Sequence, residues 1–116
     1  MYLGIDLGTS GVKVLVMDAG QGVVGSASAP LDVSRPQEGW SEQDPADWIG
    51  ACEGALEKLK AAWPDALAAV RGIGLSGQMH GAVVLDRADR VLRPAILWND
   101  GRSAAQAARL DAEPMF

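Results

Sequence analysis

The sequence predicts an α/β fold in which a mixed β-sheet packs against helices. Three short runs of apolar or small residues, separated by glycine-rich turns, occupy residues 2–30 and are typical of an antiparallel meander. A helix is expected over residues 44–63, and a further strand follows it over 70–75. Because a helical crossover usually delivers the next strand parallel to its neighbour, the sheet should combine antiparallel and parallel pairs.

The N-terminal stretch holds the first two expected strands and the link that joins them. The strands cover residues 2–5 and 12–17, and the link is Leu7–Gly11, with the sequence LGTSG. Aliphatic runs bounded by glycine are typical of strands, and a short glycine-containing link between two of them is typical of a β-hairpin. After a turn at 19–22, a third strand is expected over 23–30, and its small residues favour the edge of the sheet.

The helix over 44–63 carries its own start and stop signals. Asp44 fits the N-cap and Pro45 the first helical position, while Asp47 places negative charge in the first turn. Pro64 should end the helix. One apolar stripe recurs at helical spacing and should face the core: Trp48, Cys52, Leu56, Leu59 and Trp63. We interpret both tryptophans of this stripe as core anchors rather than as ligand-stacking residues.

The remaining chain is expected to add a loop, two more strands and a second helix. Residues 31–43 are polar and read as a loop. Strands are expected over 82–86 and 95–98, and a helix over 103–110. The expected order of elements is therefore β-β-β-α-β-β-β-α.

Composition and charge exclude several classes of function. A length of 116 residues corresponds to one domain, and 48% apolar with 22% charged residues is ordinary for a globular protein. The net charge of −5 argues against nucleic-acid binding, which needs a basic face. The single cysteine, Cys52, permits no internal disulfide and suits a reducing compartment. The sequence shows neither a targeting signal nor an apolar run of about 20 residues, so we expect a cytoplasmic protein without a membrane partner.

The link between the first two strands holds more polar chemistry than a turn requires. Glycine lets backbone N–H groups approach an anion closely, and successive amides with the hydroxyls of Thr9 and Ser10 would form a concave phosphate site. Asp6 would be repelled by phosphate unless a divalent cation lay between them, and Mg²⁺ is usually held by one or two carboxylates, waters and phosphates. Lys13 follows just beyond the turn. The link therefore indicates a site for the phosphates of a magnesium nucleotide.

Two later stretches have the polar density of a sugar site. One is Ser76–Gly81, and the other is Trp98–Arg102, with the sequence WNDGR. Sugars are bound by many donors and acceptors beside an apolar or aromatic surface, because each hydroxyl plays both roles. The candidate sugar-binding residues are Gln78, Met79, His80, Trp98, Asn99 and Asp100.

Each of these stretches also has a structural interpretation. The glycine link can be a plain hairpin with a capped strand end, and it is not a P-loop, because no Gly-Lys-Ser/Thr follows the glycines. His80 can be a satisfied surface or core histidine, and Met79 a core residue. Asn99 or Asp100 can be a helix N-cap.

Taken together, the three stretches resemble the FGGY family of carbohydrate kinases. The segment GIDLGTSGVKV is similar to that family's first phosphate motif, which belongs to the wider actin and hexokinase fold. The segments SRPQEGWSEQDPADW, GLSGQMHG and VLRPAILWNDGR resemble the members that phosphorylate xylulose, whereas glycerol and gluconate kinases differ at the last two. The resemblance covers essentially all 116 residues.

The resemblance implies a fold and an activity. The fold would be a ribonuclease H-like domain of the actin/hexokinase ATPase type, with a mixed five-stranded sheet and packed helices, forming one half of a two-lobed kinase. The activity would be the ATP-dependent phosphorylation of D-xylulose to D-xylulose 5-phosphate, with ATP and Mg²⁺ as cofactors. Residues 1–116 would form the N-terminal domain, incomplete at its C-terminal end.

The resemblance also implies roles for single residues. Asp6 would orient Mg²⁺ through water, Met79 and His80 would contact the ketose, and Arg102 would brace Asp100. The residues near the β- and γ-phosphates would be Gly8, Thr9, Ser10, Gly11 and Lys13. The residues that line or support the sugar pocket would be Gln78, Trp98, Asn99 and Asp100.

Family members are longer than this chain, and this affects the expected activity. The aspartate that accepts the proton from the sugar hydroxyl, and the lobe that holds adenosine, would lie beyond the last residue of this sequence. Because phosphoryl transfer depends on positioning and charge stabilisation, we expect the chain alone to be inactive. We also hypothesise a homodimer, formed through apolar surface that partner segments would otherwise cover. The alternatives are another ketose or polyol as substrate, an actin-like nucleotide-binding interaction module, and a truncated product without activity.

Overall fold

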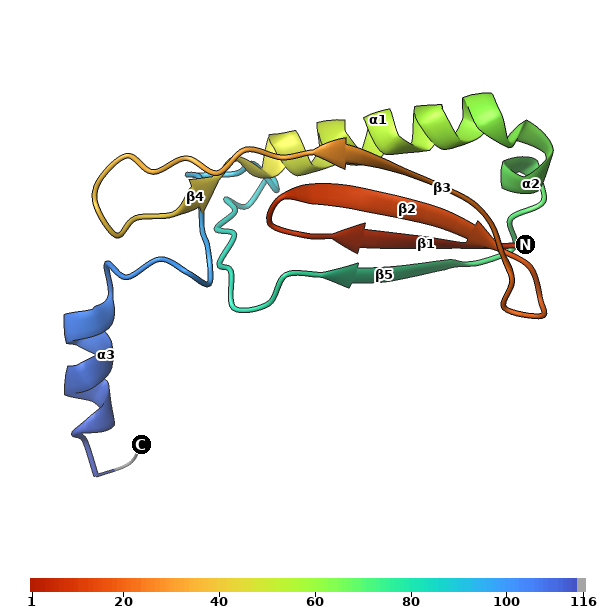
Figure 1. Cartoon of the computed structure of the whole chain (residues 1–116). Coiled ribbons are helices and arrows are strands. Elements are labelled where there is room, and N and C mark those ends of the chain that lie inside the picture. The colour runs from red at the N-terminus through yellow and green to blue at the C-terminus, as the bar shows by residue number, and fades with distance from the viewer. Residues whose placement is uncertain (115–116) are drawn as a thin grey trace.

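The predicted hairpin belongs to a four-stranded sheet. The computed structural model describes residues 1–114, so the last two residues of the predicted domain lie outside the described part. β1, β2 and β3 pair antiparallel, and β5 pairs parallel with β1 (Figure 1). The predicted meander, mixed sheet and edge position of the third strand are confirmed. In their order across the sheet the strands are β3 (Val23–Pro30), β2 (Gly11–Met17), β1 (Tyr2–Leu7) and β5 (Ile73–Gly77).

The helix α1 (Pro45–Ala62) covers one face of this sheet (Figure 1). Asp44 caps its first turn, because Asp44 Oδ1 accepts a hydrogen bond from the backbone N–H of Ala46 at 2.9 Å. Pro64 follows the end of α1 as predicted and also begins a short second helix, α2 (Pro64–Ala68). The capping signals in the sequence therefore gave the correct start and end of α1.

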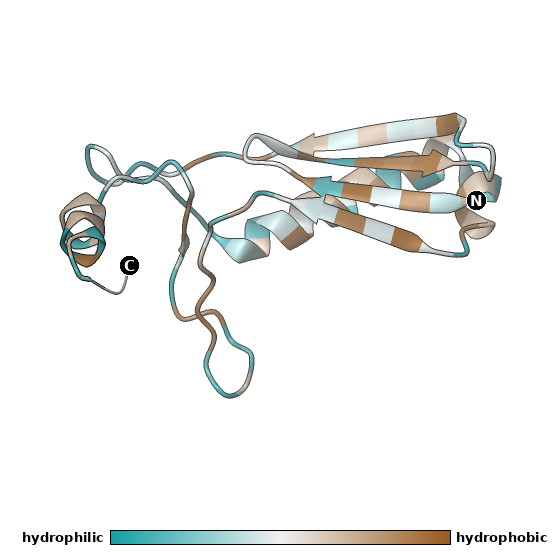
Figure 2. Ribbon diagram, turned by 90° about the horizontal axis from the view of Figure 1, so that it is seen from below, coloured by the Kyte–Doolittle hydropathy of each residue, from teal (hydrophilic) through white to brown (hydrophobic). Residues whose placement is uncertain are grey.

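The hydrophobic core lies between α1 and the sheet. Alternate residues of β2 are fully buried, which is the period expected of a strand with one covered face. The helix stripe is confirmed, since its leucine at 59 is buried and its other members pack against the core. The opposite face of the sheet is turned toward the viewer in Figure 2, in front of α1. The buried residues of this core are Leu3, Val12, Val14, Val16, Leu31, Ala55 and Leu59.

The number of strands in the main sheet differs from the prediction. Among residues 1–114 the sheet has four strands, not five, and a separate two-stranded sheet pairs β4 (Glu42–Gln43) with β6 (Ala95–Ile96). β4 lies in the stretch predicted as a polar loop. β6 is shorter than the predicted strand over 95–98, because the chain turns back after it with a hydrogen bond from Asp100 N–H to the carbonyl of Leu97.

The predicted strand over 82–86 is wrong. The Asp86 carboxylate accepts hydrogen bonds from the N–H groups of Ala88 and Arg90, which folds this segment into a tight turn. Only isolated bridges form on either side of the turn, one of them between Leu85 and Val91. The segment meets β6 at Ala82 alone, and a run of apolar residues is not sufficient for a strand where the backbone contacts stay isolated.

The last helix agrees with its prediction. α3 (Ala104–Asp111) is exposed along its whole length and lies apart from the sheet (Figure 1). The predicted strand over 70–75 corresponds to β5. It begins later than predicted, because the N–H of Val70 still bonds to the carbonyl of Leu67 at the end of α2. Within residues 1–114, none of the helices has the length and apolar character needed to cross a membrane.

Gly25 of β3 tests how tightly α1 is held on the sheet. A Cβ at Gly25 would lie 2.4 Å from Cδ2 of the Trp63 indole, which packs against the core. Gly25→Ala should therefore lower the free energy of unfolding by about 1–3 kcal/mol, the usual cost of overpacking. Thermal melting of the chain should show the loss as a fall of about 4–8 °C per kcal/mol. Gly74→Ala in β5 is the matched control, since Gly74 is also a strand glycine and a Cβ there meets open space, and an unchanged melt for Gly25→Ala would contradict the packing.

Candidate functional site

The β1–β2 link lies at the end of the sheet where the parallel strands β1 and β5 both finish (Figure 1). A hydrogen bond from the N–H of Gly8 to the carbonyl of Gly11 closes the hairpin at 2.9 Å. A Cβ on Gly11 would lie 2.7 Å from the carbonyl oxygen of Ala29, so glycine is required where the link enters β2. Ligands of α/β sheets bind beyond the carboxyl ends of parallel strands, which makes this end the expected place for a site.

Asp6 projects from the sheet face that α1 does not cover. It is exposed near the end of β1 and accepts a hydrogen bond from the hydroxyl of Ser76 on β5. Lys13 is the direct partner of Asp6 in the β1–β2 register, so the two side chains project from the same face. Together with Ser76 they line an open depression of ≈ 410 Å³. A carboxylate and an ammonium group therefore flank the glycine link on one side.

The side chain of Thr9 connects the link to both candidate sugar-binding stretches. Its Oγ1 donates a hydrogen bond to Oε1 of Gln78 at 3.0 Å and accepts one from the indole Nε1 of Trp98 at 3.1 Å. Gln78 follows β5 and Trp98 follows β6, so segments separated by 69 and 89 residues from Thr9 converge on one hydroxyl. The structure thus brings together three residues that the sequence singled out.

Gln43 of β4 is a fourth member of this network, and the sequence reasoning missed it. Its side-chain Nε2 donates a hydrogen bond to the carbonyl of Thr9 at 2.7 Å, and its Oε1 accepts one from Nε2 of Gln78 at 3.0 Å. Its Oε1 also accepts from the indole N–H of Trp48 at 2.9 Å. A two-residue strand has no periodicity that a pattern can detect, so the only signal for Gln43 was its place in the segment SRPQEGWSEQDPADW.

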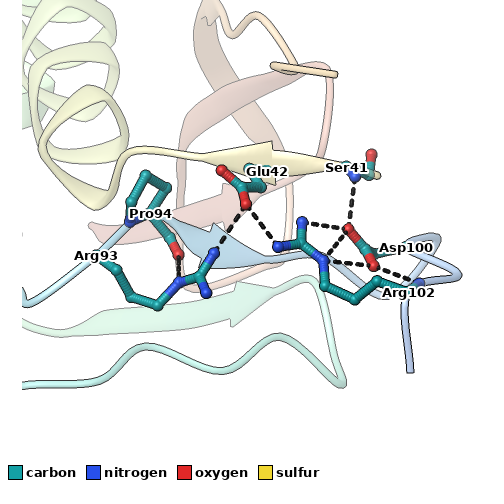
Figure 3. A network of polar contacts seen from close by, with 6 residues as sticks. All are labelled: Ser41, Glu42, Arg93, Pro94, Asp100 and Arg102. Carbon is teal, nitrogen blue, oxygen red and sulfur yellow. Dashed lines mark hydrogen bonds and ion pairs between the residues drawn. The ribbon is translucent and has the colours of Figure 1, made fainter. Parts of the chain in front are cut away.

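Asp100 lies in a cluster of ion pairs beside this network (Figure 3). Its side chain is 1% exposed, pairs with Nη2 of Arg102 at 2.6 Å and accepts a hydrogen bond from the N–H of Ser41 at 2.6 Å. Glu42 joins the cluster by pairing with Arg102 and with Arg93, each at 2.8 Å. The cluster therefore clamps the segment after β6 to β4.

Arg102 completes the clamp by stacking. Its guanidinium carbon lies 3.7 Å from the ring centroid of Trp40, within the range of a cation–π contact. The N-cap position of α3 is occupied by Ser103, so the alternative in which Asn99 or Asp100 caps this helix is wrong. The carboxylate of Asp100 instead accepts hydrogen bonds from the Arg102 side chain and from backbone N–H groups, as expected of a residue that supports a pocket.

The charge of Asp100 should make stability depend on pH. Hydrogen bonds from the Arg102 guanidinium hold the pKa of Asp100 well below its usual range, although burial opposes the shift. A lowered pKa means that the ionised carboxylate stabilises the fold above its unfolded-state pKa of about 3.9, and that this contribution is lost as pH falls below that value. Asp100→Asn should therefore melt below wild type at neutral pH, and the difference should shrink in acid. Melts in a series of buffers from neutral to strongly acidic check this, with the exposed Asp65→Asn as control, and a constant difference would contradict it.

The remaining candidates lie at the surface. His80 has a φ of 60°, in the left-handed region that residues other than glycine seldom adopt, and such residues cluster at functional sites. Met79 is 69% exposed, so its interpretation as a core residue is wrong. Ser10 and Asn99 are also exposed. These side chains are available to a ligand, whereas Gln78 and Asp100 are held by protein partners.

The donor groups near the link fit a magnesium ion held mainly by water and phosphate. Within residues 1–114, His, Cys, Asp and Glu side chains form no group of three or more that could hold a metal ion. Asp6 supplies one exposed carboxylate beside a turn suited to phosphates. Mg²⁺ usually keeps several waters and takes its other ligands from one or two carboxylates and from substrate phosphates, which matches this arrangement.

Comparisons with known proteins point to one family. A sequence profile described as the FGGY family of carbohydrate kinases, N-terminal domain, matches residues 1–115. The chain is 52% identical over 111 residues to the xylulose kinase of Klebsiella pneumoniae, covering 96% of this chain and 23% of that protein. A crystal structure of a xyloylose kinase from Brucella ovis matches with a TM-score of 0.97 at 65% identity, over 98% of this chain and 24% of that one. A gluconate kinase from Lactobacillus acidophilus matches with a TM-score of 0.82 at 26% identity, over 95% of this chain and 22% of that one.

These matches identify the fold and show how much of each relative the chain covers. The structural relatives have the actin/hexokinase-like ATPase fold, which confirms the predicted fold class. The chain spans less than a quarter of the length of each relative named above. Because the family profile covers almost all of the sequence, this chain belongs to the FGGY family of carbohydrate kinases.

Proposed function

We propose that this chain supplies the phosphate-binding link and part of the sugar pocket of a kinase that transfers the γ-phosphoryl group of ATP to D-xylulose. The product would be D-xylulose 5-phosphate. The observation that carries the proposal is the convergence of Gln78 and Trp98 on the hydroxyl of Thr9. A turn suited to phosphates is thereby joined to two stretches suited to a sugar, as a phosphoryl transfer between the two requires.

The phosphate side of the proposal rests on the glycine link and its neighbours. The residues proposed to approach the β- and γ-phosphates are Gly8, Thr9, Ser10, Gly11 and Lys13. Asp6 would hold Mg²⁺ through water, and the ion would neutralise charge that develops on the transferred phosphoryl group. The hydrogen bond from Ser76 to Asp6 would fix the direction of the carboxylate.

The sugar side rests on the segments after β5 and β6. Met79 and His80 would contact the ketose, and the exposure of both side chains leaves them accessible. Asn99 would line the pocket with them. Gln78, Trp98 and Asp100 would support it, because their polar atoms are already bonded to other parts of the chain. The group that accepts the proton of the sugar hydroxyl is proposed to lie outside these residues, and the homodimer stays a prediction.

A second sugar is the main competing assignment. The gluconate kinase of Lactobacillus acidophilus has a similar fold at lower identity, so fold alone does not select xylulose. An actin-like module that binds nucleotide without a sugar would leave the left-handed His80 and the convergence on Thr9 without a use. The xylulose assignment is supported by the higher identity to xylulose kinases over nearly the whole chain.

A sugar panel on a whole kinase tests the proposal. The chain would replace the matching segment of the Klebsiella pneumoniae xylulose kinase, and this fusion is called the chimera below. ADP formation would be measured with D-xylulose, D-ribulose, gluconate and glycerol, beside the unaltered Klebsiella enzyme. We expect D-xylulose to have the highest kcat/KM. A folded chimera that prefers gluconate or glycerol, or that hydrolyses ATP equally without sugar, would refute the proposed substrate.

A further inference from the structure

We infer that Gln43 is a positioning residue that fixes the distance between the phosphate-binding link and the sugar-binding segments. This inference rests on the proposed function, because it assigns Gln43 a part in that reaction. The residue lies in β4, outside every segment to which the sequence assigned ligand contact. Its side chain bonds directly to two such segments, through Thr9 and Gln78.

The amide of Gln43 uses its full hydrogen-bonding capacity. A glutamine side chain has two N–H donors and an oxygen with two lone pairs. Nε2 donates to the carbonyls of Thr9 at 2.7 Å and Asp32 at 3.2 Å, while Oε1 accepts from Trp48 at 2.9 Å and Gln78 at 3.0 Å. With the residue only 2% exposed, water does not compete for these partners, and the planar amide has one orientation that satisfies all four.

Three of these residues, Thr9, Gln43 and Gln78, are joined in a closed ring of hydrogen bonds at the candidate site. Gln43 bonds to the backbone of Thr9 and to the side chain of Gln78, and the hydroxyl of Thr9 bonds back to Gln78. Each of the three residues is thus held by the other two, so the link cannot shift relative to the end of β5 without breaking one of these partly buried bonds. Trp98 attaches to the same ring through Thr9.

The ring is anchored on rigid parts of the fold. Trp48 comes from α1 and packs against the core, so it holds the amide of Gln43 from the helix side. β4 is fixed by its pairing with β6 and by the ion pairs of Glu42. Gln43 therefore holds the phosphate-binding link at a fixed position relative to the core and to the two-stranded sheet of β4 and β6.

We expect the loss of the Gln43 amide to misalign the reacting groups of the two substrates rather than to weaken the binding of either substrate. Misplacing reacting groups by about 1 Å can lower the rate about a hundredfold, even when the change lies away from the reacting atoms. In the chimera, Gln43→Met should lower kcat about 10- to 100-fold, while KM for ATP and for D-xylulose stays within about threefold of wild type. A residue that served stability alone would change the melting temperature and the fraction of active enzyme, with no selective loss of kcat per folded active site.

Amide hydrogen exchange on the whole 116-residue chain tests the ring without any enzymatic assay. The N–H groups of Gly8 and Gln78 are bonded to Gly11 and Leu7, and they report on the two sides of the ring. In Gln43→Met both should exchange at least about tenfold faster relative to buried Val14, since their segments open locally. Global destabilisation alone would speed exchange at Val14 at least as much, so it cannot raise these ratios. Ratios equal to those of wild type would overturn the inference.

Two further variants sharpen the result. Gln43→Glu keeps the shape and the accepting oxygen but places a second oxygen against the carbonyls of Thr9 and Asp32, so it should raise the exchange ratio at Gly8 more than at Gln78. Gln37→Met makes the same chemical change as Gln43→Met at an exposed position of the loop before β4 and should behave as wild type. If the exchange ratios rise but the chimera lacks kinase activity with every sugar, the ring stands and the proposed function fails. If the chimera is active and Gln43→Met leaves kcat unchanged, the positioning role fails and the proposed function stands.

Discussion

Asp6→Ala in the chimera should lower kcat for D-xylulose phosphorylation about a thousandfold, because several kcal/mol of transition-state stabilisation would depend on the ion that this carboxylate orients. KM for D-xylulose should change little, since Asp6, which lies beside Lys13 and Ser76, is proposed to serve the metal and the phosphates rather than the sugar. Coupled measurement of ADP release at saturating ATP and Mg²⁺ gives both constants.

The matched control for this variant is Asp65→Ala. Asp65 is an exposed aspartate at the start of α2, at the end of the sheet away from the β1–β2 link (Figure 1). It should leave kcat within about twofold, as surface substitutions away from a site usually do. If Asp6→Ala retained wild-type turnover, Asp6 would have no part in holding the metal, and the phosphate site would have to be placed elsewhere.

His80→Ala in the chimera should lower kcat/KM for D-xylulose about 5- to 150-fold, the cost of leaving a buried sugar hydroxyl without its partner. KM for ATP should stay the same, because His80, which follows β5, is proposed to contact the sugar and not the nucleotide. The kinetic constants for each substrate, measured at saturation of the other, separate the two effects.

A second variant separates the effect of the His80 backbone conformation from that of its imidazole. His80 has a φ of 60°, and asparagine adopts this conformation more readily than alanine. If the imidazole itself contacts the ketose, His80→Asn and His80→Ala should lose similar activity. Recovery of activity in His80→Asn would mean that the left-handed backbone, and not the side chain, is what the site needs. Unchanged constants in both variants would remove His80 from the pocket.

The parts of the fold that the sequence predicted are those with a repeating pattern or a local signal. The hairpin followed from two aliphatic runs around glycine, and α1 followed from Asp44 and Pro45 at its start and Pro64 beyond its end. The parallel pairing of β5 followed from the rule for helical crossovers, and the structure adds that its partner is β1. In each case a short window of sequence contains the physical cause of the structure.

The parts that the sequence did not predict depend on long-range partners. β4 has two residues, and it exists because it pairs across about fifty residues of chain with β6, which lies in the predicted strand over 95–98. The run Val83–Leu85 has strand-like composition but stays exposed, since this segment forms isolated bridges rather than a continuous ladder with another strand. Gln43 and the Glu42 cluster were missed for the same reason, because their partners are distant in sequence.

For the site, the sequence identified residue types better than residue roles. Thr9, Gln78 and Trp98 were singled out through motifs. The structure adds that the side chains of Gln78 and Trp98 both bond to the hydroxyl of Thr9. Asp100 was singled out as a pocket residue, and its pairing with Arg102 was expected from the family resemblance, but its burial is visible only in three dimensions. Gln43, which holds Thr9 and Gln78, leaves no such local pattern.

The most direct measurement of the central claim is ADP formation with D-xylulose, made side by side on the 116-residue chain and on the chimera. The claim is that this chain provides the phosphate link and part of the sugar pocket, while the proton acceptor lies elsewhere. It predicts turnover by the chimera, loss of that turnover in Asp6→Ala, and no turnover by the chain alone. Phosphorylation of D-xylulose by the chain alone would contradict it, because the proton acceptor would then have to be one of these residues.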